Sequence, residues 1–162
     1  MKRTLVAAMF VAVVFATLNS GPIPAARAWG GGGCSADSVS ATYGFTYNGL
    51  AVLPSGSIPV AAVGNFHSDA AGNFVGSEIN NLGGTSSYQT LVGTITVNRD
   101  CSASLVAKVY QGGTLVRTSY IHLQYENNAT EVLGIFQKLV LPNNSILPVV
   151  ITIDGKRLSS GA

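Results

Sequence analysis

Residues 102–125 read SASLVAKVYQGGTLVRTSYIHLQY, and this stretch decides the class of fold. Every second residue in its first half is small or apolar: Ala103, Leu105, Ala107 and Val109. A period of two residues is that of a β-strand, whose successive side chains point to opposite faces. Gly112-Gly113 then reverses the chain, because glycine accepts the positive φ that a short hairpin turn requires. The stretch therefore predicts two adjacent antiparallel strands.

Similar short runs, rich in Val, Ile, Thr, Tyr and Phe, fill most of the remaining chain, and no helical period interrupts them. We expect eight strands, over residues 41–47, 58–66, 74–79, 88–98, 103–109, 115–125, 130–141 and 149–153. The turn signals between and after them are Asn48-Gly49, Pro54–Ser57, Asp69–Asn73, Asn80–Gly84, Arg99–Cys101, Gly112-Gly113, Pro142–Ser145 and Asp154-Gly155. Gly, Asn, Asp and Pro in these positions are typical of turns.

Strands joined in sequence by short turns favour a meander in which each strand pairs with its neighbours. We therefore predict an all-β fold, an antiparallel up-and-down eight-stranded barrel formed by one domain, residues 41–162. Closure removes both sheet edges, and a barrel of this size either packs its interior or encloses one small ligand. A two-sheet β-sandwich is the alternative.

The amino end has the features of a secretory signal peptide. Lys2 and Arg3 precede an apolar run over residues 5–18, and Ala26-Arg27-Ala28 provides small residues for cleavage before Trp29. These 14 residues fall short of the roughly 20 needed to span a bilayer. We expect a signal peptide at residues 1–28, a flexible Gly-rich lead-in at 29–40, and a secreted or periplasmic protein without a transmembrane segment after cleavage.

Composition excludes several classes of protein. Only 10% of the 162 residues are charged and 47% are hydrophobic, unlike a disordered chain or a nucleic-acid-binding domain. Cleavage after Ala28 would remove three of the nine basic residues and none of the seven acidic ones, so the net charge would change from +2 to −1. The basic character therefore belongs to the targeting segment, and we expect no nucleic-acid partner.

The chain has two cysteines, Cys34 and Cys101. In an exported protein a pair of cysteines usually forms a disulfide. This disulfide would tie the first segment of the domain to its middle. Metal binding is the weaker alternative, because a tetrahedral site needs four ligands at close spacing.

One set of segments resembles a group of known proteins. It comprises Tyr43-Gly44-Phe45, Pro59–Gly64 with Phe66, Asp69–Asn73, Gly76 and Gly93–Val97 leading to Asp100-Cys101, and covers residues 41–105. It resembles small secreted bacterial proteins of unknown role that look like eight-stranded barrels, similar to the calycins and the allene oxide cyclase barrel. The resemblance is architectural and implies no catalytic residues. Ala70 and Ala71 depart from it, because the corresponding turn is usually richer in glycine.

Aromatic residues are the main candidates for ligand binding. Tyr43, Phe45 and Tyr47 share one strand face, and with Phe66 and Phe74 they could wall an apolar pocket or simply pack as a core. A second candidate is the face of residues 115–125 that bears Tyr120 and His122, with Val116, Thr118 and Gln124. That mixed face could line a polar cavity or face water.

Motifs for catalysis or cofactors are absent from the sequence. It has no Gly-x-Ser-x-Gly nucleophile motif, phosphate loop, dinucleotide fingerprint, calcium loop or zinc spacing. His67 has no predicted carboxylate neighbour, and Glu126 and Glu131 flank a hairpin turn where both would be solvated. We expect no cofactor and no metal, and the catalytic residues, if any, are unknown.

The sequence thus favours an exported, non-enzymatic barrel of unknown role, which could bind a small apolar ligand or simply persist as a stable extracellular module. One alternative is an enzyme like allene oxide cyclase, in which His122 or Glu78 would be needed for turnover. Another is a structural protein of the envelope or cell surface. The oligomeric state is open.

Overall fold

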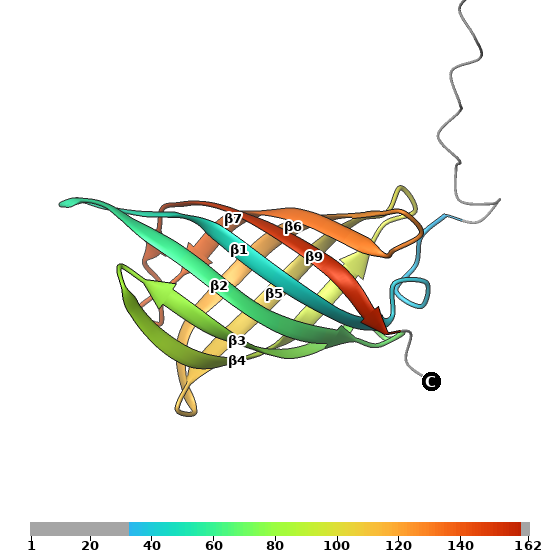
Figure 1. Cartoon of the computed structure of the whole chain (residues 1–162), viewed down its shortest axis with the longest axis horizontal. Coiled ribbons are helices and arrows are strands. Elements are labelled where there is room, and N and C mark those ends of the chain that lie inside the picture. The colour runs from blue at the N-terminus through green and yellow to red at the C-terminus, as the bar shows by residue number, and fades with distance from the viewer. Residues whose placement is uncertain (1–32, 160–162) are drawn as a thin grey trace, which may run out of the picture.

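The computed structural model describes residues 33–159, which form strands and connections without a helix (Figure 1). The strands are β1 (Ala41–Leu53), β2 (Gly56–Ser68), β3 (Asn73–Leu82), β4 (Thr85–Val97), β5 (Ser102–Gln111), β6 (Thr114–Glu126), β7 (Glu131–Val140), β8 (Ile146–Leu147) and β9 (Val149–Ser159). The predicted signal peptide, residues 1–28, lies outside the described residues, as does the beginning of the predicted lead-in.

The sheet closes on itself. Strands β1 to β7 each pair antiparallel with the next strand, and β9 pairs antiparallel with both β7 and β1. The two-residue β8 pairs with the end of β7 and lies outside this ring. The result is a closed eight-stranded antiparallel barrel, so the predicted fold class is confirmed and the sandwich alternative is wrong. Figure 1 shows the strands tilted across the barrel, as closure requires.

Aromatic side chains dominate the barrel interior. Tyr43 is fully buried, and its ring centroid lies 5.1 Å from that of Phe66. Phe66 in turn lies 5.1 Å from Phe74. Burial of each such ring stabilises the fold by on the order of 2 kcal/mol. The alternation of inward and outward residues that predicted the strands therefore also gives most of the core.

Some glycines face inward where two strands approach closely. A Cβ on Gly49 would lie 2.0 Å from the backbone oxygen of Val150, and a Cβ on Gly93 would lie 1.8 Å from that of Val106. The predicted turn at Asn48-Gly49 is wrong, because β1 continues through it to Leu53. The predicted strand end at Asp154-Gly155 is wrong for the same reason, since β9 continues to Ser159.

The other turns agree better with the sequence. Gly72, Gly112 and Gly113 have positive φ of 81°, 57° and 81°, as expected for tight hairpin connections. The turn predicted over residues 80–84 is shorter, because β3 continues to Leu82 and only Gly83-Gly84 form the connection. Asn80 is therefore a strand residue, and its side chain is buried inside the barrel.

A segment before β1 covers one end of the barrel, here called the closed end. Residues 34–40 lie beside the connections around residues 69–72, 98–101 and 127–130. The predicted disulfide between Cys34 and Cys101 is formed, with a Cα–Cα distance of 4.9 Å. Val39 is fully buried. A disulfide is compatible with a location outside the cytosol, and no helix within residues 33–159 is long and apolar enough to cross a membrane.

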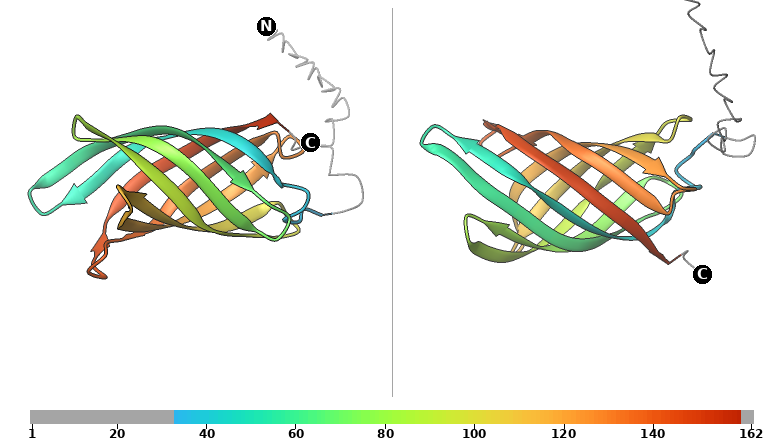
Figure 2. Two further views of the ribbon diagram at one scale, coloured as in Figure 1. Left: turned by 90° about the horizontal axis from the view of Figure 1, so that it is seen from below. Right: turned by 45° about the horizontal axis from the view of Figure 1, so that its top comes forward.

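The opposite end, here called the mouth, has no covering segment among the described residues. It is surrounded by the β1–β2, β3–β4 and β5–β6 connections and by residues 141–148, which include β8. These hairpins project from the barrel by different lengths (Figure 2). The barrel is thus covered at one end by the disulfide-linked segment and open at the mouth.

Candidate functional site

A cavity of about 460 Å³ opens at the mouth. Small-molecule sites in proteins usually enclose about 300–1,000 Å³. The walls are mostly apolar, with Thr85, Ser87 and Gln111 as polar wall residues, and every strand of the barrel contributes. The apolar wall residues are Ala51, Val60, Leu82, Val116, Phe136, Leu139, Leu141, Leu147, Val149 and Ile151.

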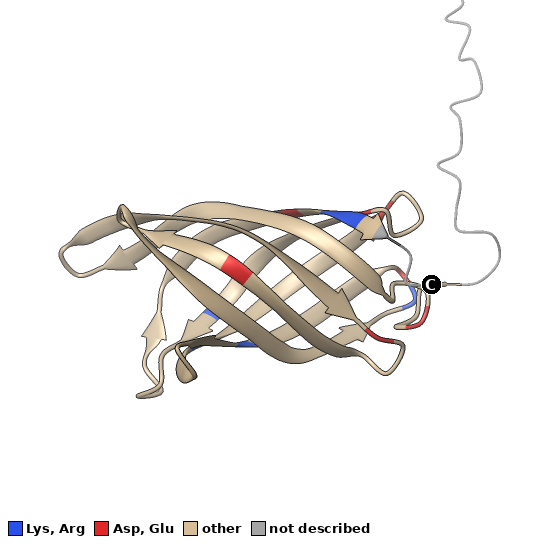
Figure 3. Cartoon of the chain, turned by 60° about the horizontal axis from the view of Figure 1, so that its bottom comes forward, with Lys and Arg blue, Asp and Glu red and all other residues tan. Residues whose placement is uncertain are grey.

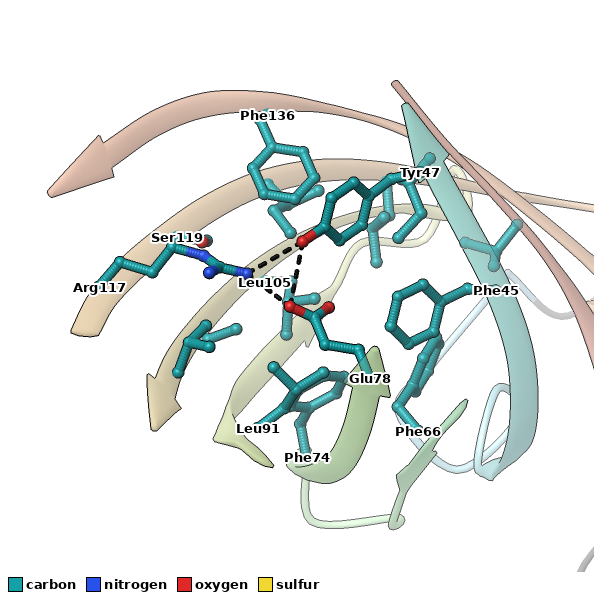
Figure 4. Close-up of a pocket in the computed structure, with 16 residues that line it drawn as sticks. Phe45, Tyr47, Phe66, Phe74, Glu78, Leu91, Leu105, Arg117, Ser119 and Phe136 are labelled. Carbon is teal, nitrogen blue, oxygen red and sulfur yellow. Dashed lines mark hydrogen bonds and ion pairs between the residues drawn. The ribbon is translucent and has the colours of Figure 1, made fainter. Parts of the chain in front are cut away.

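Five polar side chains form a hydrogen-bonded cluster at the base of this cavity, and we call it the polar floor: Tyr47, Asn80, Gln89 and Arg117, which line the cavity, and Glu78, which lies behind them. They come from β1, β3, β4 and β6, where each is an inward-facing strand residue. Figure 4 shows the Arg117 guanidinium, the Tyr47 hydroxyl and the Glu78 carboxylate pointing toward one another. The barrel therefore brings together residues that are far apart in the sequence.

Arg117 and Tyr47 connect the floor by hydrogen bonds. Arg117 donates from Nη2 to Glu78 Oε1 at 2.5 Å and to the Tyr47 hydroxyl at 3.0 Å, and from Nη1 to Gln89 Oε1 at 2.6 Å. The Tyr47 hydroxyl donates to Glu78 Oε1 at 3.0 Å and accepts from Asn80 Nδ2 at 2.7 Å. Every member of the floor is thus fixed by at least one other member.

The floor contains a buried ion pair. The Glu78 side chain is 2% exposed and that of Arg117 is 13% exposed. Removal of either partner would leave the other charge uncompensated in a poorly solvated place. Burial also raises the pKa of Tyr47 above its ordinary value, an effect that the Arg117 charge opposes only in part. Tyr47 therefore stays a neutral hydroxyl and donates a hydrogen bond to Glu78.

A second, much smaller space lies on the other side of the floor. It measures about 30 Å³, and Phe45, Phe66 and Phe74 are among the residues that surround it. Ser119 also lines it, and the Ser119 hydroxyl has no hydrogen-bond partner among the described residues. This volume is comparable to that of about one water molecule. The polar floor thus separates a nearly filled aromatic core from the open cavity.

The predicted ligand-binding residues fall into two groups. Phe45 and Phe66 lie in the aromatic core below the floor and Tyr43 lies deeper, toward the closed end, while Tyr47 is in the floor and reaches the cavity. Tyr120 and His122 are half-buried on the outer surface of β6, and neither lines a cavity described above. The Nζ of Lys138 lies 5.3 Å from the centroid of the Tyr120 ring. A binding role for these residues stays a prediction.

Sequence reasoning missed Arg117, Asn80 and Gln89. A usable signal was present in β6, where Ile121, Leu123 and Tyr125 alternate as buried residues. Extending that alternation toward the amino end of β6 reaches Ser119 and Arg117. Charged residues are rare in this chain, so an arginine on the buried face of a strand was a sign of a functional site.

The remaining candidates are away from the cavity. His67 is exposed, with its Nδ1 3.3 Å from the Thr42 hydroxyl. Glu126 and Glu131 are cross-strand neighbours beside a turn at the closed end. Within the described residues, no group of three or more His, Cys, Asp or Glu side chains could hold a metal ion.

Comparisons of this chain with family models, curated proteins and solved structures found no match. The barrel architecture is consistent with that of the calycins. The rest of the predicted resemblance stays a prediction. The cavity and its polar floor are the features of the molecule that bear on its function.

Proposed function

We propose that this protein binds a small, largely apolar molecule in the cavity at its mouth. The observation that supports the proposal is a cavity of about 460 Å³ with apolar walls and a polar floor. Apolar contact would supply affinity, at about 25 cal/mol for each Å² removed from water. The few polar groups would orient the ligand, as in most small-molecule sites.

The proposed place of action is outside the cytosol. The signal-peptide pattern at residues 1–28 supports export. The disulfide between Cys34 and Cys101 is compatible with it, because disulfides persist in oxidising compartments. Neither alternative, a cyclase-like enzyme or a structural protein of the envelope, has a specific contact in its favour among residues 33–159.

A matched pair of tryptophan variants tests the proposal. Ala51 is buried and lines the cavity, whereas Ala61 points outward from β2. We expect Ala51→Trp to fill part of the cavity and to weaken binding of prodan, an uncharged dye whose emission reports apolar surroundings. Ala61→Trp should leave the prodan titration unchanged. Thermal melting of both variants would verify that they fold.

A second experiment asks what the protein binds in its source. Native mass spectrometry of protein purified from its own host should detect a retained apolar compound in the wild type. Absence of a retained compound, together with equal prodan binding by wild type and Ala51→Trp, would contradict the proposal.

A further inference from the structure

We infer that the cavity prefers an uncharged amphipathic ligand, with a hydroxyl or carbonyl head at the polar floor and an apolar tail toward the mouth. Carboxylates and ammonium ions with the same tail should bind more weakly. The inference rests on the proposed function and names the chemical class of its ligand. Three observations support it: the charge balance of the floor, the composition of the mouth, and the free hydrogen-bonding groups.

The floor has no net charge to offer a ligand. Arg117 is the one basic residue that lines the cavity within the described chain, and Glu78 neutralises it at 2.5 Å. An anionic head would meet a guanidinium whose charge is already balanced by the Glu78 carboxylate behind it. Since transfer of a charge into an apolar cavity is costly without a counter-charge, charged heads should be disfavoured.

The mouth offers no charge either. Its connections read Pro54-Ser55, Gly83-Gly84, Gly112-Gly113 and, over residues 141–148, LPNNSILP. Charged residues instead gather around the closed end, at Asp69, Arg99, Asp100, Glu126 and Glu131. Figure 3 shows the mouth connections free of charged residues. Electrostatic steering, which speeds the association of charged ligands, therefore has no source in these connections.

The floor still has hydrogen-bonding capacity for a neutral head. The hydrogen bonds described for Arg117 use three of the five N–H donors of its guanidinium. The bond described for Asn80 uses its amide nitrogen and leaves its carbonyl oxygen as an acceptor. A hydroxyl can both donate and accept, so it matches this combination, and a carbonyl can use the Arg117 donors alone.

Three ligands with one tail and different heads test the inference. Decanol, decanoate and decylammonium would each be titrated against wild-type protein loaded with prodan at neutral pH. We expect decanol to displace prodan at a concentration at least about tenfold lower than either ion does. This comparison needs no variant, so it does not depend on the stability of a mutant.

Replacement of the counter-charge provides a second readout. Glu78→Gln keeps the size of the side chain and leaves the Arg117 charge unbalanced, so decanoate should gain about tenfold relative to decanol. The control is Glu131→Gln at the closed end, which should leave the ranking unchanged. Decanoate binding as tightly as decanol to wild type would overturn the inference and leave the proposed function standing. Failure of prodan and all three ligands to bind would overturn both.

Discussion

Tyr43 and Tyr125 are neighbours in the core, but their hydroxyl groups have different surroundings. Their ring centroids are 5.7 Å apart. Tyr43 donates to the backbone oxygen of Ala129 at 2.8 Å, whereas the buried Tyr125 hydroxyl has no partner among the described residues. Burying a polar group lowers the stability of the fold unless a hydrogen bond compensates for the lost contact with water.

We therefore predict different effects of removing these two hydroxyls. Tyr43→Phe should lower the free energy of unfolding by about 1 kcal/mol, because it leaves a buried carbonyl unpaired. Tyr125→Phe should leave stability unchanged or raise it by up to about 1 kcal/mol. Urea unfolding at neutral pH measures both, and a loss of stability in Tyr125→Phe equal to that in Tyr43→Phe would contradict the assignment.

The ion pair of the polar floor gives the next prediction. Arg117→Met should destabilise the protein by about 3 kcal/mol, because Glu78 then keeps a buried charge without compensation. The double variant Arg117→Met with Glu78→Gln should recover much of this loss. A double-mutant cycle in urea measures the coupling. Additive effects of the two substitutions would show that the charges do not depend on each other.

At this scale the sequence predicted some cavity residues and missed others. Tyr47 was identified because it shares one strand face with Tyr43 and Phe45, at a spacing of two residues. Asn80 was missed because residues 80–84, NNLGG, together have the composition of a turn. Arg117 was missed because the opposite face of its strand, with Tyr120 and His122, was considered as the face that could line a cavity.

Among the secondary-structure elements, β4 shows how closely the strands pack. A side chain at Gly93 would place its Cβ 1.8 Å from the Val106 oxygen of β5. The adjacent Thr94 points outward and is exposed. The register of β4 against β5 therefore depends on the absence of one side chain.

We predict that Gly93→Ala destabilises the protein by about 2 kcal/mol or more, because β4 and β5 must move apart. Thr94→Ala, on the neighbouring residue, should change stability by less than about 1 kcal/mol. Thermal melting followed by circular dichroism compares the two. Equal melting temperatures for both variants would show that the contact is easily relieved.

This packing also explains which elements sequence reasoning could find. Alternation within a strand is local, so it predicted the eight main strands. Glycine is needed at position 49 because of a distant residue, Val150, which is about a hundred residues away in the chain. Without that partner, Asn48-Gly49 has the composition of a hairpin turn. The predicted strand ends were therefore wrong where they depend on contacts between residues far apart in the sequence.

For the whole molecule, the buried tyrosines predict sensitivity to alkaline pH. Burial raises the pKa of Tyr43 to about 12, and it also raises the pKa of Tyr47 and Tyr125. In the unfolded chain these phenols ionise near pH 10. Ionisation therefore favours the unfolded state above about pH 10, and the stability that depends on neutral tyrosines is present below that pH.

We expect the free energy of unfolding to be insensitive to tyrosine ionisation between neutral pH and about pH 9, and to fall between about pH 10 and 12. Urea midpoints measured across this range test the expectation. Tyr125→Phe serves as the control, since it should reduce the slope above about pH 10. A wild-type midpoint that stays constant to about pH 12 would contradict it.

The disulfide-linked segment and the end of β9 both lie at the closed end, as Figure 1 shows. The chain therefore enters and leaves the barrel on the side away from the cavity. Attachment to a bead, a sensor chip or a fusion partner next to Cys34 or Ser159 should leave the entrance facing open solution. Within residues 33–159 the cavity opens at the mouth, so a bound ligand should dissociate before the next one enters. The rate of exchange should then equal the dissociation rate, whatever the concentration of the competing ligand.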